Sequence, residues 1–196
     1  HTTVSQNELK SLIISAQASS KVCLPRPGTI SLDFIKPILD SGADGMILPM
    51  IESVESANLA NSYIKFPPSG NRSYGVNRAH GFGFNFDEYI NNWNESSIIM
   101  HQIESIAGVD TLESILAHQK PDAVMIGPYD LSASLGRPGD FNSPDFKKAQ
   151  EKIIAICNDM KVSCGIQIND ASEELVAEKI KMGFNFITVS YTHLRA

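Results

Sequence analysis

The sequence predicts an α/β fold built around a parallel sheet. Short apolar runs of strand length recur along the chain, and each is followed by a segment with helical periodicity. The runs are continuous rather than alternating, which is typical of parallel strands buried on both faces. Because the chain has 196 residues, 42% of them apolar and 19% charged, we expect one globular domain over residues 1–196.

Six segments have the composition of buried strands. They are rich in Val, Ile and Met, and the helical segments between them supply the crossovers that parallel strands need. The expected strands cover residues 22–24, 45–50, 97–103, 123–126, 162–168 and 184–189. An eight-stranded β/α barrel needs two more strands, so this count predicts either an open sheet or a barrel that has lost its beginning.

The helices between these strands carry start and stop signals. Gly42 and Gly183 each follow a helical segment, where glycine commonly ends a helix. Ser53 is a candidate N-cap, and Pro144 suits the first position of a helix that follows Ser143. The expected helices cover residues 35–40, 53–60, 106–116, 144–156 and a last segment that ends at 182.

One segment, residues 66–83, is too rich in Gly and Pro for a helix or a strand. Loops of this length in a compact domain are usually functional or disordered. The aromatic residues of this loop and its two arginines, Arg72 and Arg78, favour an ordered, functional loop.

Charge and cysteine content exclude several classes of protein. The net charge is −6, and the 16 Lys and Arg residues are scattered, which argues against a nucleic-acid partner. Cys23, Cys157 and Cys164 form no CxxC pair and leave one cysteine over in any disulfide scheme, so we expect small core residues in a reducing, cytoplasmic compartment. No apolar run is long enough to cross a bilayer, so we expect no membrane partner.

The candidate catalytic groups follow the ends of predicted strands. In parallel β/α folds, chemistry is carried out at the carboxyl ends of the strands. Glu104 follows the strand 97–103, and Asp130 follows the strand 123–126. Neighbouring strands lie roughly 4.8 Å apart, so both carboxylates can converge on one point. A hard divalent cation such as Mg²⁺ or Mn²⁺ suits that arrangement, because it binds one or two carboxylates and keeps positions for water and substrate.

A simpler interpretation needs no metal ion. Glu104 can cap a helix that begins at Ser105, and Asp130 can cap one that begins at Leu131. The local pattern leaves both interpretations open.

Four motifs together resemble the HpcH/HpaI-type metal-dependent (class II) pyruvate aldolases. Gln102-Ile103-Glu104 corresponds to the QIE of that family, and residues 127–136 (GPYDLSASLG) correspond to its GPxDLSxxxG. Residues 39–50 (LDSGADGMILPM) and 66–73 (FPPSGNRS) are similar to two further family motifs. The four motifs occur in the family's order over almost the whole chain.

The resemblance implies a (β/α)8 TIM barrel of the phosphoenolpyruvate/pyruvate type, here with strands 3 to 8 and truncated at both ends. It also implies a carbon–carbon lyase, with 4-hydroxy-2-oxo acids, including 2-keto-3-deoxy sugar acids, cleaved to pyruvate and an aldehyde through a metal-bound enolate. Glu104 and Asp130 become the ligands of Mg²⁺, Mn²⁺ or Co²⁺. Gln102 and the backbone N–H groups of Tyr129 and Asp130 would bind the substrate. Arg26 would stabilise negative charge during cleavage, a task that suits a permanently charged guanidinium.

The family's general base is a histidine paired with a glutamate. His1 stands at the matching distance before Arg26, and an imidazole that titrates near neutral pH fits this work. A frayed terminal residue is the simpler interpretation of His1. His80, His101 and His118 are interpreted as surface or loop residues, although His80 can approach a substrate from its loop.

The resemblance leaves alternatives for function and assembly. A related acyl-CoA lyase of the citrate/malyl-CoA lyase type also pairs Glu with Asp around Mg²⁺, and a non-catalytic module can retain 2-oxo acid binding alone. The family commonly forms hexamers, so we expect a homo-oligomer for the full-length protein. Residues 190–196 do not resemble the family's continuation and are interpreted as a foreign tail.

Overall fold

The computed structural model describes residues 4–170 and 172–189. These residues divide into two compact units. Unit 1 contains residues 4–49 and 58–99, and unit 2 contains residues 50–57, 100–170 and 172–189. The candidate metal ligands Glu104 and Asp130 both belong to unit 2, whereas Arg26 belongs to unit 1.

The structure confirms the α/β class and five of the six expected strands. The strands are β1 (Gly45–Leu48), β2 (Ile98–Ile103), β3 (Ala123–Ile126), β4 (Ser163–Ile168) and β5 (Phe186–Val189). They follow one another in a five-stranded sheet, in which β2 to β5 pair in parallel. The expectation of a (β/α)8 barrel, truncated here to strands 3 to 8, is therefore wrong for the described part of the chain, because its sheet has five strands, neither the six expected nor a closed barrel of eight.

The expected strand at residues 22–24 has no regular secondary structure, although the backbone at residues 23–25 hydrogen-bonds to residues of and before β1. The Asp44 N–H donates to the Cys23 carbonyl at 3.1 Å, and the Ile47 N–H donates to the Pro25 carbonyl at 3.1 Å. Pro25 and Pro27 have no N–H groups to donate in return. The Cys23 N–H donates to the Asp44 carboxylate at 2.8 Å rather than to a neighbouring backbone carbonyl. The apolar pattern therefore located a segment that hydrogen-bonds beside β1 without forming a regular strand.

Nine helical segments accompany the strands in the described residues. They are α1 (Gln6–Ala18), α2 (Leu32–Asp40), α3 (Val54–Ile64), η1 (Arg78–Gly83), α4 (Phe86–Ser96), α5 (Ile106–His118), α6 (Pro128–Ser134), α7 (Pro144–Met160) and α8 (Glu173–Met182). None of these helices is long and apolar enough to span a membrane.

Several expected helix ends are confirmed. The Ser53 hydroxyl accepts from the Ser56 N–H at 3.2 Å, and the Ser143 hydroxyl accepts from the Phe146 N–H at 3.3 Å. Gly183 ends α8 with φ +108°, a conformation that favours glycine. The helices α1 and α4 were not expected from the sequence.

The loop of residues 66–83 in unit 1 is ordered by a buried arginine. Arg72 is 1% exposed, and its guanidinium lies 4.7 Å from the ring centres of both Phe66 and Trp93. The guanidinium donates to Asp40 Oδ1 at 3.2 Å and to the Tyr89 hydroxyl at 2.9 Å. This arginine therefore has a structural role, because a buried cation needs such partners to offset its lost hydration.

The same loop also buries His80. The His80 ring is 2% exposed, and its Nδ1 accepts from the Gly83 N–H at 3.0 Å, while its Nε2 lies 2.7 Å from the Gly75 carbonyl. His80 thus connects the two sides of the loop, and the expectation of a surface or loop residue is wrong with respect to its exposure.

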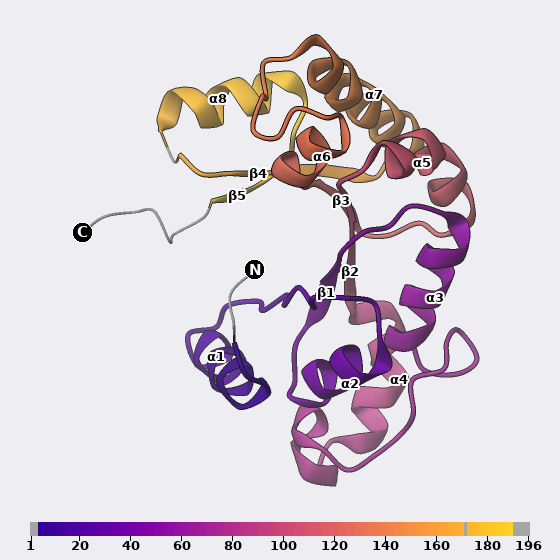
Figure 1. Ribbon diagram of the computed structural model, residues 1–196. Coiled ribbons are helices and arrows are strands. Elements are labelled where there is room, and N and C mark those ends of the chain that lie inside the picture. The colour runs from indigo at the N-terminus through magenta and orange to yellow at the C-terminus, as the bar shows by residue number, and fades with distance from the viewer. Residues whose placement is uncertain (1–3, 171, 190–196) are drawn as a thin grey trace. The chain divides into compact units, whose positions relative to one another are not determined.

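The register of unit 2 gives its sheet two different faces. Gln102 pairs with Met125, and Met125 pairs with Gly165, so these residues share one face. Ile103, Ile126 and Ile166 pair in the same way and point to the opposite face. A methyl group added at Gly108 in α5 would lie 3.4 Å from Ile103 Cγ2, which places α5 on this second face. Helix α7 contacts both α5 and β4 (Figure 1).

A buried histidine in β2 predicts acid-sensitive stability. His101 is 0% exposed, contrary to the expectation of a surface residue, and burial lowers its pKa from 6.5 to about 4. Between these pH values the unfolded chain binds a proton that the folded chain does not. The free energy of unfolding should therefore fall by about 3 kcal/mol as the pH drops from 6.5 to 4.

This prediction can be checked by denaturation of the parent chain and a His101→Gln variant at several pH values. The variant should lose about 3 kcal/mol less stability over this window, whereas His118→Gln, at the exposed end of α5, should behave like the parent. Equal acid losses in the parent and His101→Gln would show that His101 is not responsible.

Candidate active site

Glu104 is a buried carboxylate at the carboxyl end of β2. It is 2% exposed, and its Oε1 accepts a hydrogen bond from the Met50 backbone N–H at 2.8 Å. The next N–H, of Ile51, donates to the Gln102 carbonyl at 3.3 Å. Burial of a carboxylate is costly unless partners replace its water, and the backbone at residues 50–51 supplies one of them.

Met50 holds its N–H toward Glu104 in a conformation that is uncommon for its residue type. Its φ is +50°, in the left-handed region, where a non-glycine residue carries strain. Sequence reasoning did not assign a role to Met50. The role could not be inferred from residue type, because the contribution comes from the backbone.

Gly127 provides the space in which Gln102 and Glu104 meet. It follows β3 directly, and its N–H donates to the Ile103 carbonyl at 3.2 Å. A methyl group added at Gly127 would lie 2.6 Å from Gln102 Nε2 and 2.7 Å from Glu104 Oε2. The amide and the second carboxylate oxygen therefore both lie against this glycine. The sequence analysis included Gly127 only within the motif of residues 127–136 and gave it no role of its own. A glycine at a strand end is nevertheless a signal that other atoms approach the backbone closely.

Asp130 lies in the first turn of α6. The helix begins at Pro128 after Gly127, and its hydrogen bonding starts with the Leu131 N–H donating to the Gly127 carbonyl at 2.9 Å. The N–H groups of Tyr129 and Asp130 lie in the first turn of the helix, before this bond. The Asp130 side chain is exposed. That it converges with Glu104 on one cation remains a prediction.

Neither carboxylate is the N-cap residue of the helix expected to follow it. Ser105 caps α5, because its hydroxyl accepts from the Gly108 N–H at 3.1 Å. Gly127 is the N-cap of α6, and Asp130 lies within the helix. Glu104 and Asp130 therefore stand near helix starts without acting as their N-caps.

Of the two expected catalytic residues, only Arg26 is among the described residues. Arg26 is half-buried in unit 1, in the extended segment beside β1. His1 lies outside the described residues. Their positions relative to Glu104 stay predictions.

The donor set in unit 2 fits a hard divalent cation with open positions. The residues that the structure describes contain no cluster of three or more His, Cys, Asp or Glu side chains suited to a metal ion. A site with two carboxylates does not need such a cluster, because Mg²⁺ commonly takes one or two carboxylates and completes its shell with water and substrate oxygens. The Met50 N–H holds Glu104 Oε1, and Glu104 Oε2 lies beside Gly127. This arrangement fits a carboxylate that binds a cation through one oxygen, Oε2.

Comparison with known proteins identifies one family over nearly the whole chain. The family model described as HpcH/HpaI aldolase/citrate lyase matches residues 4–192. A relative named 2-keto-3-deoxy-L-rhamnonate aldolase, from Salmonella paratyphi B, is 35% identical over 179 residues. That match covers 90% of this chain, and this chain spans 65% of the relative's length.

Solved structures agree with this match. An HpcH/HpaI aldolase/citrate lyase family protein from Burkholderia cenocepacia is 30% identical, with a TM-score of 0.89 over 95% of this chain and 74% of that protein. An HpcH/HpaI aldolase from Desulfitobacterium hafniense is 28% identical, with a TM-score of 0.88 over 97% of this chain and 73% of that protein.

Proposed function

Because this chain belongs to the HpcH/HpaI aldolase/citrate lyase family, we propose that its protein is a divalent-metal-dependent aldolase. The substrate class is a 4-hydroxy-2-oxo acid of the 2-keto-3-deoxy sugar acid type, and the products are pyruvate and an aldehyde. The observation that carries this proposal is the juxtaposition of Gln102 and Glu104 Oε2 against Gly127 at the end of β3.

The residues of unit 2 bind and orient the 2-oxo acid. Glu104 and Asp130 would hold Mg²⁺ or Mn²⁺, which supplies Lewis-acid polarisation of the ketone when bound. The Gln102 amide would hydrogen-bond the pyruvyl part of the substrate. The N–H groups of Tyr129 and Asp130 would receive its carboxylate, since the start of a helix favours negative charge.

Cleavage moves one proton and one electron pair. The base removes the proton of the C4 hydroxyl, the C3–C4 bond breaks, and C4 becomes the aldehyde carbon. The electron pair of that bond moves into the enolate of pyruvate, which is then protonated at C3. We assign the base to His1 and stabilisation of the developing negative charge to Arg26.

The direct test is pyruvate release from a panel of 4-hydroxy-2-oxo acids, with and without a chelator. We expect cleavage of at least one substrate, loss of at least about 99% of the rate with EDTA, and recovery with added Mg²⁺ or Mn²⁺. Turnover that is insensitive to the chelator would contradict the metal assignment.

The description of the family also includes citrate lyase, so the panel should contain an acyl-CoA substrate of the malyl-CoA type. Cleavage of the thioester alone would replace the aldolase proposal with an acyl-CoA lyase. Binding of pyruvate or oxalate without any turnover would identify a binding module. We further propose a cytoplasmic homo-oligomer, which sedimentation of the full-length protein would test.

A further inference from the structure

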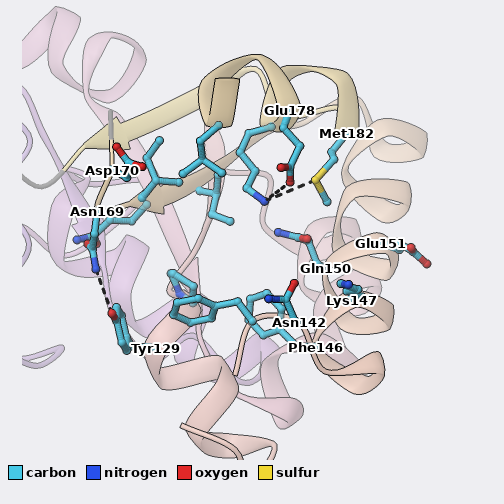
Figure 2. Close-up of a pocket in the computed structure, with 17 residues that line it drawn as sticks. Tyr129, Asn142, Phe146, Lys147, Gln150, Glu151, Asn169, Asp170, Glu178 and Met182 are labelled. Carbon is cyan, nitrogen blue, oxygen red and sulfur yellow. Dashed lines mark hydrogen bonds and ion pairs between the residues drawn. The ribbon is translucent and has the colours of Figure 1, made fainter. Parts of the chain in front are cut away.

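Unit 2 contains a cavity of about 450 Å³. It lies between β4, α7, α8 and the start of α6 (Figure 2). Its walls include the buried side chains of Phe146, Ile166 and Ile168, which are 2%, 3% and 6% exposed. This volume is within the usual range for sites that bind small molecules.

The buried apolar wall of this cavity, formed by Ile166 and Ile168, lies on the opposite face of the sheet from Gln102, while the start of α6 with Tyr129 also lines the cavity. Ile166 pairs with Ile126, and Ile126 pairs with Ile103. These three residues therefore share the face that α5 covers. Gln102 points to the other face, because successive residues of a strand alternate. The cavity therefore extends away from Gln102 and Glu104, and Tyr129 contributes its side chain to it, whereas the 2-oxo acid is proposed to use the Tyr129 backbone N–H.

A buried amide without a partner points into this cavity. Gln150 in α7 is 2% exposed, and its Nε2 has no hydrogen-bond partner among the described residues. Figure 2 shows the Gln150 side chain extending toward the centre of the cavity, whereas Glu151 points away from it. A buried donor left unpaired is costly, so this position calls for an acceptor atom from a bound molecule.

A cation in the same wall determines the chemistry of that acceptor. The Lys179 side chain is 16% exposed, and its ammonium lies 2.9 Å from Glu178 Oε1. The Glu178 side chain is 59% exposed, and ion pairs of this kind are weak. Asp170, another acid of the lining, already accepts from the Ser172 N–H at 3.0 Å. Lys179 Nζ also donates to Met182 Sδ at 3.7 Å, and the exposed Lys147 lines the cavity as a further cation. The cavity thus offers the unpaired amide of Gln150 and the weakly paired ammonium of Lys179 beside apolar walls.

We propose that this cavity is a second binding site, for a small molecule with an apolar body and a carboxylate. The apolar body would contact Phe146, Ile166 and Ile168. The carboxylate would accept from Gln150 Nε2 and from Lys179 Nζ, in place of the exposed carboxylate of Glu178.

Calorimetric titration of the protein with octanoate tests this proposal. Octanoate should bind, and octylamine should not. Gln150→Leu and Lys179→Gln should each weaken octanoate binding about tenfold or more, because each removes a donor to a charged group. Met182→Trp should abolish binding by filling the cavity. Lys148→Gln, an exposed lysine on α7 outside the cavity lining, is the matched control and should bind like the parent.

The outcomes separate this proposal from the proposed aldolase activity. Glu104→Gln should bind octanoate with unchanged affinity even if it has lost all turnover. Circular dichroism establishes that each variant is folded, and Gln150→Leu should fold because it replaces an unpaired buried amide with an apolar side chain. The proposal is overturned if octanoate does not bind, if Gln150→Leu, Lys179→Gln and Met182→Trp all bind like the parent, or if Glu104→Gln alone abolishes binding.

Discussion

Replacing Glu104 by Gln should lower kcat/KM for aldol cleavage by about a thousandfold or more. The loss of one carboxylate charge removes the main ligand of the proposed cation, and Lewis-acid stabilisation is worth several kcal/mol. The protein should remain folded, because the new amide keeps an oxygen that can accept from the Met50 N–H, as Glu104 Oε1 does at 2.8 Å. Steady-state assays with saturating Mn²⁺, together with titration of Mn²⁺ binding, measure both effects.

The matched control for this variant is Glu113→Gln. Glu113 lies on α5 and is exposed, so the same chemical change there should leave kcat/KM and Mn²⁺ affinity unchanged. A Glu104→Gln enzyme with a normal rate would refute the proposed metal role of Glu104.

Replacing Gly127 by Ala should lower kcat/KM about a hundredfold and weaken Mn²⁺ binding. The added methyl group would lie 2.6 Å from Gln102 Nε2 and 2.7 Å from Glu104 Oε2, too close for either atom to stay in place. A displacement of about 1 Å in a catalytic group can cost two orders of magnitude in rate. Kinetics and Mn²⁺ titration of the folded variant measure this effect.

Gly75→Ala is the control for the backbone change. A methyl group at Gly75 would meet no atom within 4 Å, so this variant should keep normal activity. If Gly127→Ala retained normal kcat/KM and metal affinity, Gln102 and Glu104 would not form the proposed site beside Gly127.

The sequence predicted the central elements of the fold because burial determined them. The strands β2 and β3 were placed within one residue of their observed ends, since a short, continuous apolar run between two helical segments is typical of a parallel strand buried on both faces. The strand expected at residues 22–24 was not confirmed, because the Cys23 N–H donates to the Asp44 carboxylate, and Pro25 and Pro27 have no N–H to donate to a ladder. The apolar pattern predicted six strands in an open sheet or an incomplete barrel, whereas the eight-stranded barrel came from the family resemblance, and the described sheet has five strands.

Helix α1 was missed because its apolar face is weak. Only Ile13 of this helix is buried, and its start depends on the capping box formed by Ser5 and Glu8. Periodicity finds helices that cover a core, and α1 buries too little for that pattern to be visible.

The part of the candidate site that is formed by side chains at strand ends could be predicted from the sequence. Gln102 and Glu104 follow one face of β2, and the structure brings both against Gly127 as the strand order required. The contribution of Met50 was not predictable, because any residue type carries the same N–H and only the backbone at φ +50° directs it to Glu104. The burial of His101 was missed even though the run 97–103 predicts a strand buried on both faces, because the histidine was interpreted from its residue type alone.

The most direct test of the central claim is the location of Mn²⁺ in crystals of the full-length protein grown with pyruvate or oxalate. We expect one anomalous scattering peak that lies about 2.0–2.4 Å from a carboxylate oxygen of Glu104 and from one of Asp130. A peak bound by other residues, or no peak at a concentration of Mn²⁺ that supports turnover, would contradict the claim that these two side chains share a catalytic cation.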